Sequence, residues 1–234
     1  MDFISDSFRT ALWLLLSFDP EVYGIISVSV KVSCSAIFLA AAIGLPVGVL
    51  LATREFPLRR TMVLLTNTFM GLPTVFVGLL VLSFLSRKGP LGGLGLLFTP
   101  AAMVMGQLIL AFPIIAGVSY ASLASLDPRI SLSSRTLGAS PFREVLTLLV
   151  EGRLGVVSAI LAAFGRVFTE VGASLMLGGN IRFYTRNIPT AIALETGKGE
   201  FALALALGIV LLAIALLVNF LVHLLSVRLR EGEY

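Results

Sequence analysis

The chain has 234 residues, of which 57% are hydrophobic and 13% charged. Soluble domains carry about 25% charged residues, so this composition excludes an ordinary soluble enzyme and indicates an integral membrane protein. A single cysteine, Cys34, excludes an internal disulfide and a cysteine-rich metal site. The net charge of +4 comes from dispersed basic residues, which mark membrane topology and not nucleic-acid binding. We expect one domain, 1–234.

The N-terminal segment 1–21 is predicted to contain a helix that lies in the membrane interface. Its apolar run, 11–16, is too short to cross a bilayer, which requires about 20 residues. Trp13, with Arg9 and Asp19 flanking the run, is typical of a helix at the membrane surface.

Five further segments are apolar enough and long enough to span a membrane. We expect helices over about 25–52, 62–85, 100–120, 154–177 and 201–227. The predicted fold is therefore all-α, a polytopic membrane bundle of about five transmembrane helices. Pro46, Pro73 and Pro113 are each expected to interrupt a span, because proline removes a backbone hydrogen bond and clashes with the preceding turn. Gly44 and Gly48 have a spacing that lets two helix backbones approach closely.

The distribution of basic residues predicts the orientation. Five spans place the termini on opposite sides of the membrane. With the N-terminus outside, the inner side holds Arg54, Arg59, Arg60, Arg129, Arg135, Arg143, Arg153, Arg228 and Arg230, against six basic residues outside. Cytoplasmic loops carry the excess of Lys and Arg, so we expect the N-terminus outside and the C-terminus inside.

A polar stretch, 125–153, separates the third and fourth spans and lies in the cytoplasm in this orientation. Its many charged residues cannot lie cheaply in hydrocarbon, so it must stand in water. Turn residues divide it into two helical segments: Gly138 allows a close turn, and Ser140 and Pro141 suit the N-cap and first residue of the second helix. A structured polar loop of this kind predicts a docking surface for a soluble partner.

This loop resembles the coupling loop of the inner-membrane permease subunits of binding-protein-dependent ABC importers. The string 135–142, RTLGASPF, carries the resemblance, whereas the family's Glu-Ala-Ala falls on Leu-Ser-Ser at 132–134 and its terminal proline is absent. The resemblance implies a fold like that of type I ABC importers, with cytoplasmic coupling helices that contact an ATPase. The residues implied in that contact are Ser134, Arg135, Gly138, Ala139, Ser140, Pro141, Phe142 and Arg143. Arg135 and Arg143 are expected to make its polar contacts.

The segment 164–181, FGRVFTEVGASLMLGGNI, resembles the oxyanion branch of that family, the molybdate, tungstate and sulfate permeases. The strings 165–172 and 194–199 look closest to the tungstate-type permeases. The resemblance implies a homodimer in the cytoplasmic membrane, two ATP-binding-cassette subunits on its inner side and a periplasmic or surface-anchored oxyanion-binding protein on its outer side. It implies no cofactor on this chain, since ATP and Mg bind to the ATPase. Molybdate and sulfate stay open as substrates.

A conducting path for a tetrahedral dianion must replace its hydration without holding it too tightly to release. Hydroxyl groups and helix ends can do this. The candidate pathway or gate residues are Thr74, Arg166, Thr169, Glu170, Ser174, Gly178, Gly179 and Asn180, with Thr66 as a further hydroxyl. Arg166 and Glu170 share a helix face and form either a structural ion pair, which we favour, or a gate. Gly178–Asn180 are also expected to cap a helix end.

Other polar residues have simpler expectations. Lys31 is expected to extend its stem to the interface. Arg182 and Arg186 lie just outside the fourth span, where they can attract the anion or contact the binding protein. His223 is expected to hydrogen-bond within its helix, near Asn219, and not to bind a metal. Cys34 is expected to be a small packing residue.

Three other functions compete with transport driven by a separate ATPase. An intramembrane enzyme is disfavoured because neither H-E-x-x-H nor G-x-S-x-G occurs. The string TGKGE at 196–200 resembles only the end of a phosphate-binding loop, and Gly199 replaces the required Ser or Thr, so the chain is not expected to be an ATPase. An ion-coupled secondary transporter usually has more spans and an internal repeat. It stays the strongest alternative.

Overall fold

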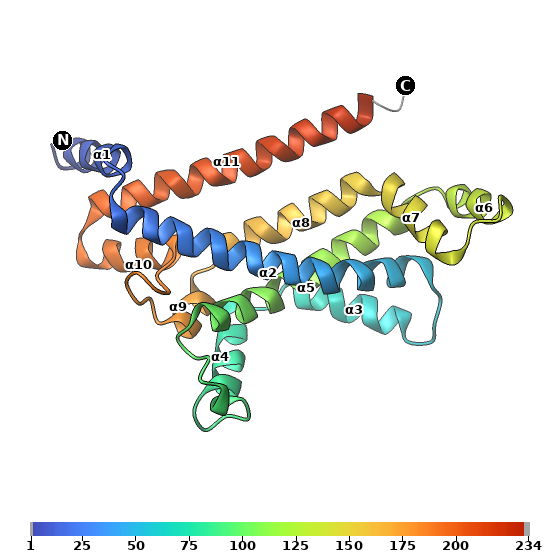
Figure 1. Ribbon diagram of the computed structural model, residues 1–234, viewed down its shortest axis with the longest axis horizontal. Helices are drawn as coiled ribbons and strands as arrows, with labels where there is room; N and C mark the ends of the chain where they lie inside the picture. Colours follow the sequence, from blue (N-terminus) through green and yellow to red (C-terminus); the bar gives the residue numbers. More distant parts are fainter. Residues whose placement is uncertain (1, 232–234) are drawn as a thin grey trace.

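The computed structural model of the chain describes residues 2–231, and within them the side chains of residues 6–221 and 224. In these residues the regular elements are helices, which confirms the all-α prediction (Figure 1). Their bounds are α1 Asp2–Leu16, α2 Pro20–Thr53, α3 Arg59–Met70, α4 Thr74–Leu85, η1 Gly92–Leu94, α5 Pro100–Ala124, α6 Pro128–Thr136, α7 Pro141–Glu151, α8 Arg153–Phe168, α9 Gly172–Gly178, α10 Ile188–Lys198 and α11 Phe201–Glu231.

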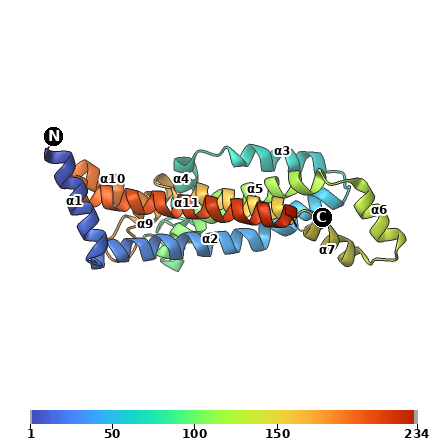
Figure 2. The ribbon, with the colours of Figure 1, turned by 90° about the horizontal axis from the view of Figure 1, so that it is seen from above.

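The long helices run along one axis of an elongated molecule (Figures 1 and 2). Helix α5 is central and packs most extensively against α2 and α8. Helix α11 packs against α1 and α10 at one end and runs alongside α8 toward the other (Figure 1). The pair α6–α7 lies at the end opposite α1 and α10, so the polar loop and the N-terminal segment occupy opposite ends of the molecule.

Small residues allow the helices around α5 to approach closely. A Cβ atom added to Gly48 of α2 would lie 2.8 Å from the carbonyl oxygen of Ala116, and one added to Gly44 would lie 3.2 Å from Ile115. At the crossing of α5 and α8, a Cβ atom on Gly155 would lie 1.6 Å from Ser122 Oγ. The prediction that Gly44 and Gly48 serve close helix packing is confirmed.

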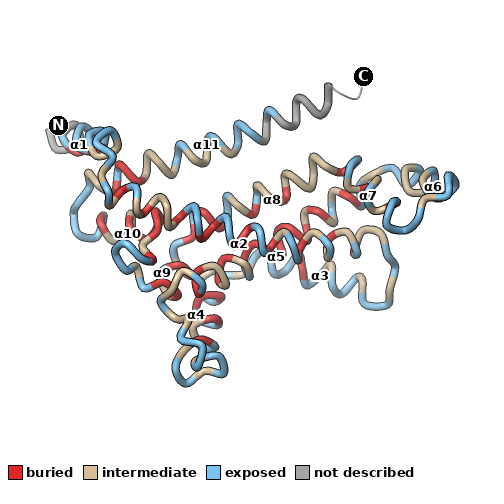
Figure 3. The backbone as a smooth tube through the Cα atoms, in the orientation of Figure 1, coloured by how far each residue is buried: buried red, intermediate tan, exposed pale blue. Residues whose placement is uncertain are grey.

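Among the residues that the structure describes, three helices are long and apolar enough to cross a membrane: α2, α5 and α11 over Phe201–Leu221. The number rises to five if two bent helix pairs, α3 with α4 and α7 with α8, each count as one span. Buried residues line the contacts around α5, whereas the outer surfaces of the bundle are exposed (Figure 3). The exposed surface of α11 carries Leu212, Leu216, Leu217 and Phe220, as suits a helix that faces hydrocarbon or another apolar surface.

Two predicted spans are not continuous helices. The segment 62–85 bends by 102° between α3 and α4, where Pro73 cannot donate a backbone hydrogen bond. The segment 154–177 is broken after Phe168, and α9 begins only at Gly172. The prediction that the other two prolines interrupt their spans was wrong. Helices α2 and α5 continue through Pro46 and Pro113 because neighbouring helices in a bundle compensate for the lost bond.

Candidate functional site

The first candidate site is the helical hairpin α6–α7 at one end of the molecule. Gly138 has a left-handed φ of +81° between the two helices, a conformation that only glycine adopts without strain. The Oγ atom of Ser140 accepts a hydrogen bond from the Arg143 N–H at 3.4 Å, and Pro141 is the first residue of α7. The predicted close turn, N-cap and proline start are confirmed.

Glu144 joins the two helices of the hairpin from within. Its Oε1 atom accepts hydrogen bonds from Arg135 Nε at 2.9 Å and from Ser131 Oγ, and lies 2.8 Å from Arg135 Nη2 in an ion pair. These bonds, first from Arg135 and then from Ser131, hold the pKa of the Glu144 carboxyl below its usual value. Sequence reasoning assigned Arg135 to an ATPase contact. The structure gives its guanidinium a partner inside the chain, one the sequence analysis missed.

The hairpin carries large apolar side chains on its exposed surface. Leu137 is 87% exposed and Phe142 is 71% exposed, and Leu132 is exposed on α6. Arg143 lies beside Phe142, is exposed, and forms no ion pair with the described residues. Clustered exposed apolar side chains with a free cation at their edge are typical of a protein contact.

The second candidate site lies where the two broken spans meet. Helices α4 and α9 pack so closely that a Cβ atom on Gly78 would lie 3.0 Å from Ala173 Cα. A Cβ atom on Gly172 would lie 3.3 Å from Thr74 Oγ1 and 3.4 Å from Glu170 Oε1. The breaks at 71–73 and 169–171 therefore form one junction, which brings Thr74 and Glu170 together from segments nearly a hundred residues apart.

Glu170 is buried at this junction, and each of its two carboxylate oxygens has a polar partner. Its Oε1 accepts a hydrogen bond from the Ala173 N–H at 3.0 Å, and its Oε2 lies 3.3 Å from Arg166 Nη1. The Arg166 side chain is 41% exposed on α8, and Thr169 is exposed next to it. The Thr169 hydroxyl donates to the Gly165 carbonyl oxygen at 3.0 Å. The predicted ion pair between Arg166 and Glu170 is therefore present.

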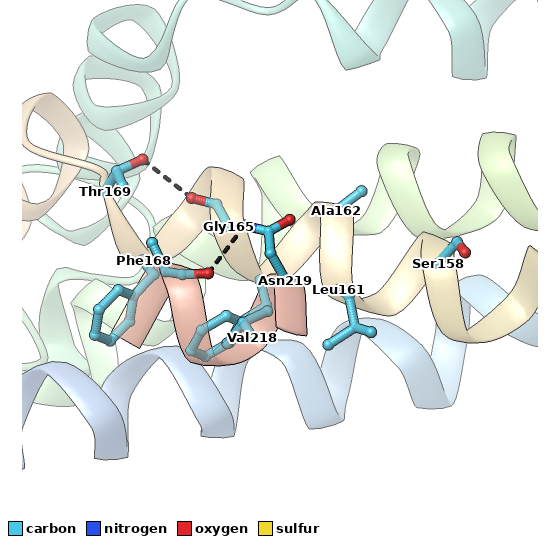
Figure 4. A pocket seen from close by; sticks show the side chains of 10 residues that line it. Ser158, Leu161, Ala162, Gly165, Phe168, Thr169, Val218 and Asn219 are labelled. Carbon is cyan, nitrogen blue, oxygen red and sulfur yellow. Dashed lines mark hydrogen bonds between the residues drawn. The ribbon is translucent and has the colours of Figure 1, made fainter. Parts of the chain in front are cut away.

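A cavity of about 310 Å³ opens beside this junction, between α8 and α11 (Figure 4). Its lining is mainly apolar, with three polar side chains. The lining residues are Ser158, Leu161, Ala162, Phe164, Gly165, Phe168, Thr169, Ala215, Val218 and Asn219. The Asn219 amide donates to the Ala215 carbonyl oxygen at 2.9 Å. The side chain of His223 lies outside the described residues, so the predicted proximity of His223 to Asn219 stays a prediction.

The other candidate pathway hydroxyls lie elsewhere. Ser174 is buried against α5, where its Oγ accepts a hydrogen bond from Gln107 Nε2 at 3.4 Å. Thr66 is buried and donates to the Met62 carbonyl oxygen at 2.8 Å. The structure therefore does not bring Ser174 or Thr66 together with Thr169. Gln107 was not found from the sequence, since one glutamine in an apolar helix gives no pattern.

The end of α9 has the predicted cap. Gly179 and Asn180 both have positive φ angles, +69° and +52°, which end the helix after Gly178. The Asn180 side chain also accepts a hydrogen bond from Thr190 Oγ1 at 3.0 Å, which ties this turn to α10. Helix α10 itself begins with a capping box at Asn187, a signal present in the sequence but not used.

The end of the bundle opposite the hairpin is held by an ionic network. Glu21, at the start of α2, binds Arg182 at 2.6 Å and Arg186 at 3.1 Å, and Arg186 also lies 3.5 Å from Glu195. Lys198 pairs with Glu195 at 3.0 Å. The hydrogen bonds to Glu21 raise the pKa of the Arg182 guanidinium. The two arginines expected to attract the anion are therefore paired within the chain.

Two expectations for α2 have different outcomes. Lys31 is exposed and forms no ion pair with the described residues, which agrees with a side chain free to extend along the helix surface. Cys34 is exposed, so the prediction of a packing residue was wrong. Among the described residues, no group of three His, Cys, Asp or Glu side chains is placed to hold a metal ion.

The chain is thus a bundle of helices, three of them long and apolar enough to cross a membrane, with a helical hairpin at one end that exposes apolar side chains. The chain matches the family described as "Binding-protein-dependent transport system inner membrane component" over residues 44–231 and belongs to it. It is 41% identical, over 97% of its length and 95% of the relative's, to the tungstate uptake system permease protein TupB of Campylobacter jejuni. It is 39% identical to the TupB protein of Peptoclostridium acidaminophilum, over 97% of this chain and 99% of the relative.

The fold also matches a solved structure. The inward-facing MetNI methionine ABC transporter superposes with a TM-score of 0.71 at 23% identity, covering 93% of this chain and 96% of that one. At this identity the match concerns the fold alone. The resemblance found in the sequence is confirmed: the chain is a multi-pass inner-membrane permease of an ABC importer and is not itself the ATPase. Such a permease works with ATPase subunits and a binding protein.

Proposed function

We propose that this chain is the permease subunit of an importer that moves tungstate into the cytoplasm, driven by ATP hydrolysis in its partner subunits. The observation that carries the proposal is the similarity of almost the whole chain to two permeases named for tungstate uptake. The ionic chemistry agrees with an anion as cargo, since Arg166 lies within a span and its side chain is 41% exposed.

The proposed assembly contains two copies of this chain, two ATPase subunits and one oxyanion-binding protein. The hairpin α6–α7 faces the cytoplasm, which places the N-terminus outside and the C-terminus inside. The exposed Leu137 and Phe142 insert into the ATPase, and Arg143 makes a polar contact at their edge. Ser134, Gly138, Ala139, Ser140 and Pro141 shape this surface, and Arg135 supports it through Glu144. Closure of the ATPases then rocks the bundles and alternates access.

The proposed pathway passes the junction of the two broken spans. Thr74, Arg166, Thr169 and Glu170 lie there and form the gate region. The turn at 178–180 borders its outer end. Ser174 supports the junction from inside the bundle, since it is buried against α5.

Reconstitution with the cognate ATPase and binding protein in liposomes tests the function. We expect uptake of tungstate that requires ATP and the loaded binding protein and that persists when a proton uncoupler is added. Uptake abolished by the uncoupler would instead identify a secondary transporter. Preferential uptake of molybdate or sulfate, each offered under the same conditions, would replace tungstate as the substrate.

A further inference from the structure

In the proposed orientation, the junction of the two broken spans lies well inside the membrane. Helix α8 rises about 1.5 Å per residue, so Arg166 lies about 20 Å from Arg153 at the inner end of the helix. The hydrocarbon core is about 30 Å thick. Irregular backbone at such depth occurs where protein buries it or where it lines a water-filled cavity, and paired helix breaks are a recurrent feature of transport sites.

The two members of the ion pair differ in how many of their polar atoms have hydrogen-bond partners. Glu170 is 3% exposed and both its oxygens accept hydrogen bonds, from the Ala173 N–H and from Arg166. Arg166 is 41% exposed and contacts the carboxylate through Nη1 alone. Its Nε and Nη2 groups donate to no described residue. A purely structural lock would use the guanidinium fully, because unpaired donors at this depth are costly.

There is open space on α8 beside Gly165, the residue that precedes Arg166. A Cβ atom on Gly165 would meet nothing within 4 Å, and Thr169 is exposed on the same side of α8. The cavity shown in Figure 4 includes both Gly165 and Thr169. The planar fork of arginine is the protein group best suited to bind two oxygens of an oxyanion at once.

We infer that Arg166 is an in-membrane contact for the transported oxyanion, which binds its unused Nε and Nη2 groups over Gly165 and Thr169. This inference rests on the proposed function and deepens it. Glu170 competes with the transported oxyanion for the Arg166 guanidinium. A dianion next to an unpaired guanidinium inside a span would be held too tightly to leave, whereas the neighbouring carboxylate weakens that attraction and permits release.

Transport by neutral variants is the first test. Arg166→Gln should lower tungstate uptake at least tenfold, while loaded binding protein still stimulates the ATPase. The double variant Arg166→Gln/Glu170→Gln removes both charges and so leaves no buried unpaired carboxylate. It should assemble normally and still fail to transport. Uptake by the double variant within twofold of the wild type would overturn the inference and leave the pair as a structural lock.

Accessibility of the site is the second test, and it does not depend on transport. The chain has one cysteine, so Cys34→Ser gives a cysteine-free background. In the assembled complex, Gly165→Cys should react with a water-soluble anionic thiosulfonate, and millimolar tungstate should slow this reaction. Adding Arg166→Gln should remove the protection, and adding Glu170→Gln should lower the protecting concentration severalfold.

The outcomes separate this inference from the proposed function. A wild-type complex that imports no tungstate contradicts the function itself. A complex that imports tungstate, but in which Gly165→Cys is unreactive or is not protected by tungstate, contradicts only the role of Arg166.

Discussion

The two polar ends of this permease are held in opposite ways. At the end that we propose to be cytoplasmic, called the inner end, the hairpin α6–α7 is closed by Arg135 and Glu144, nine residues apart in the chain. At the outer end, Glu21 binds Arg182 and Arg186, which lie 161 and 165 residues away. The inner end is therefore a local unit that can move as a body, and the outer end is a clamp between distant segments.

Burial supports this contrast. The inner hairpin exposes its apolar side chains, with Leu137 and Phe142 pointing away from the bundle core. At the outer end the Arg186 side chain is only 11% exposed, and the Ile188 N–H donates to Ser29 Oγ of α2 at 2.7 Å. A transporter needs one part that transmits force and another that holds its frame. In the proposed function, the hairpin has the first task and the clamp has the second.

The largest expected effect comes from the root of the hairpin, where α8 crosses α5. Gly155→Ala places a methyl group 1.6 Å from Ser122 Oγ, so the helices must separate. We expect a loss of about 3 kcal/mol or more and little assembled protein. Gly208→Ala in α11 is the matched control, since its added Cβ meets nothing within 4 Å. Equal thermal unfolding temperatures for the two purified variants would show that the crossing is not rigid.

The next effect concerns the coupling of ATP hydrolysis to transport. Arg143→Glu reverses the charge beside Phe142 without touching a contact within the chain. In liposomes it should reduce tungstate uptake per ATP hydrolysed about tenfold, because like charges at a docking surface cost several kcal/mol. Arg143→Lys keeps the charge and should retain most of the coupling. An unchanged ratio in the Glu variant would remove Arg143 from the ATPase contact.

The clamp at the outer end predicts a loss of stability and not of coupling. Glu21→Gln leaves Arg186, which is mostly buried, with only Glu195 as its ionic partner. We expect the unfolding temperature to fall by roughly 5 °C. Glu55→Gln removes a solvent-exposed carboxylate 3.9 Å from Arg59 and should change it by less than about 1 °C. A normal unfolding temperature with lost transport would mean that the network acts in the cycle.

Sequence reasoning predicted local features well and long-range partners poorly. The roles at the hairpin turn are local, since each residue acts through its own backbone or on an N–H three residues away. The order of residues along the chain was therefore enough to predict the roles of Gly138, Ser140 and Pro141. Glu144 and Glu21 were missed because nothing in their neighbourhood indicates which arginine they will meet. Composition predicted about five spans. The described residues contain three continuous helices of spanning length, or up to five spans if each bent pair counts as one.

The positions of the helix breaks were also predicted only in part from the sequence. Proline was expected to interrupt three spans, but only Pro73 does so. The break after Phe168 contains no proline, and the Glu170 carboxylate satisfies the freed Ala173 N–H there. Whether a helix breaks depends on which groups can replace its lost hydrogen bonds. At this break the group is a carboxylate three residues from the N–H, and not the proline on which the prediction relied.

The smallest expected effect is the pH dependence of the hairpin. The pKa of Glu144 is lowered in the folded protein by its bonds with Arg135 and Ser131. A lowered carboxyl pKa contributes stability that is complete above the unfolded value, 4.5 for a free glutamate, and is lost as pH falls through the folded value. Hydrogen exchange over residues 128–151, corrected for intrinsic rates, should therefore show protection falling severalfold between pH 6 and pH 3. In Glu144→Gln, protection should be low at both pH values, because the amide cannot replace the ionic pair. If the wild type and this variant lost protection in parallel as the pH fell, Glu144 would not be what closes the hairpin.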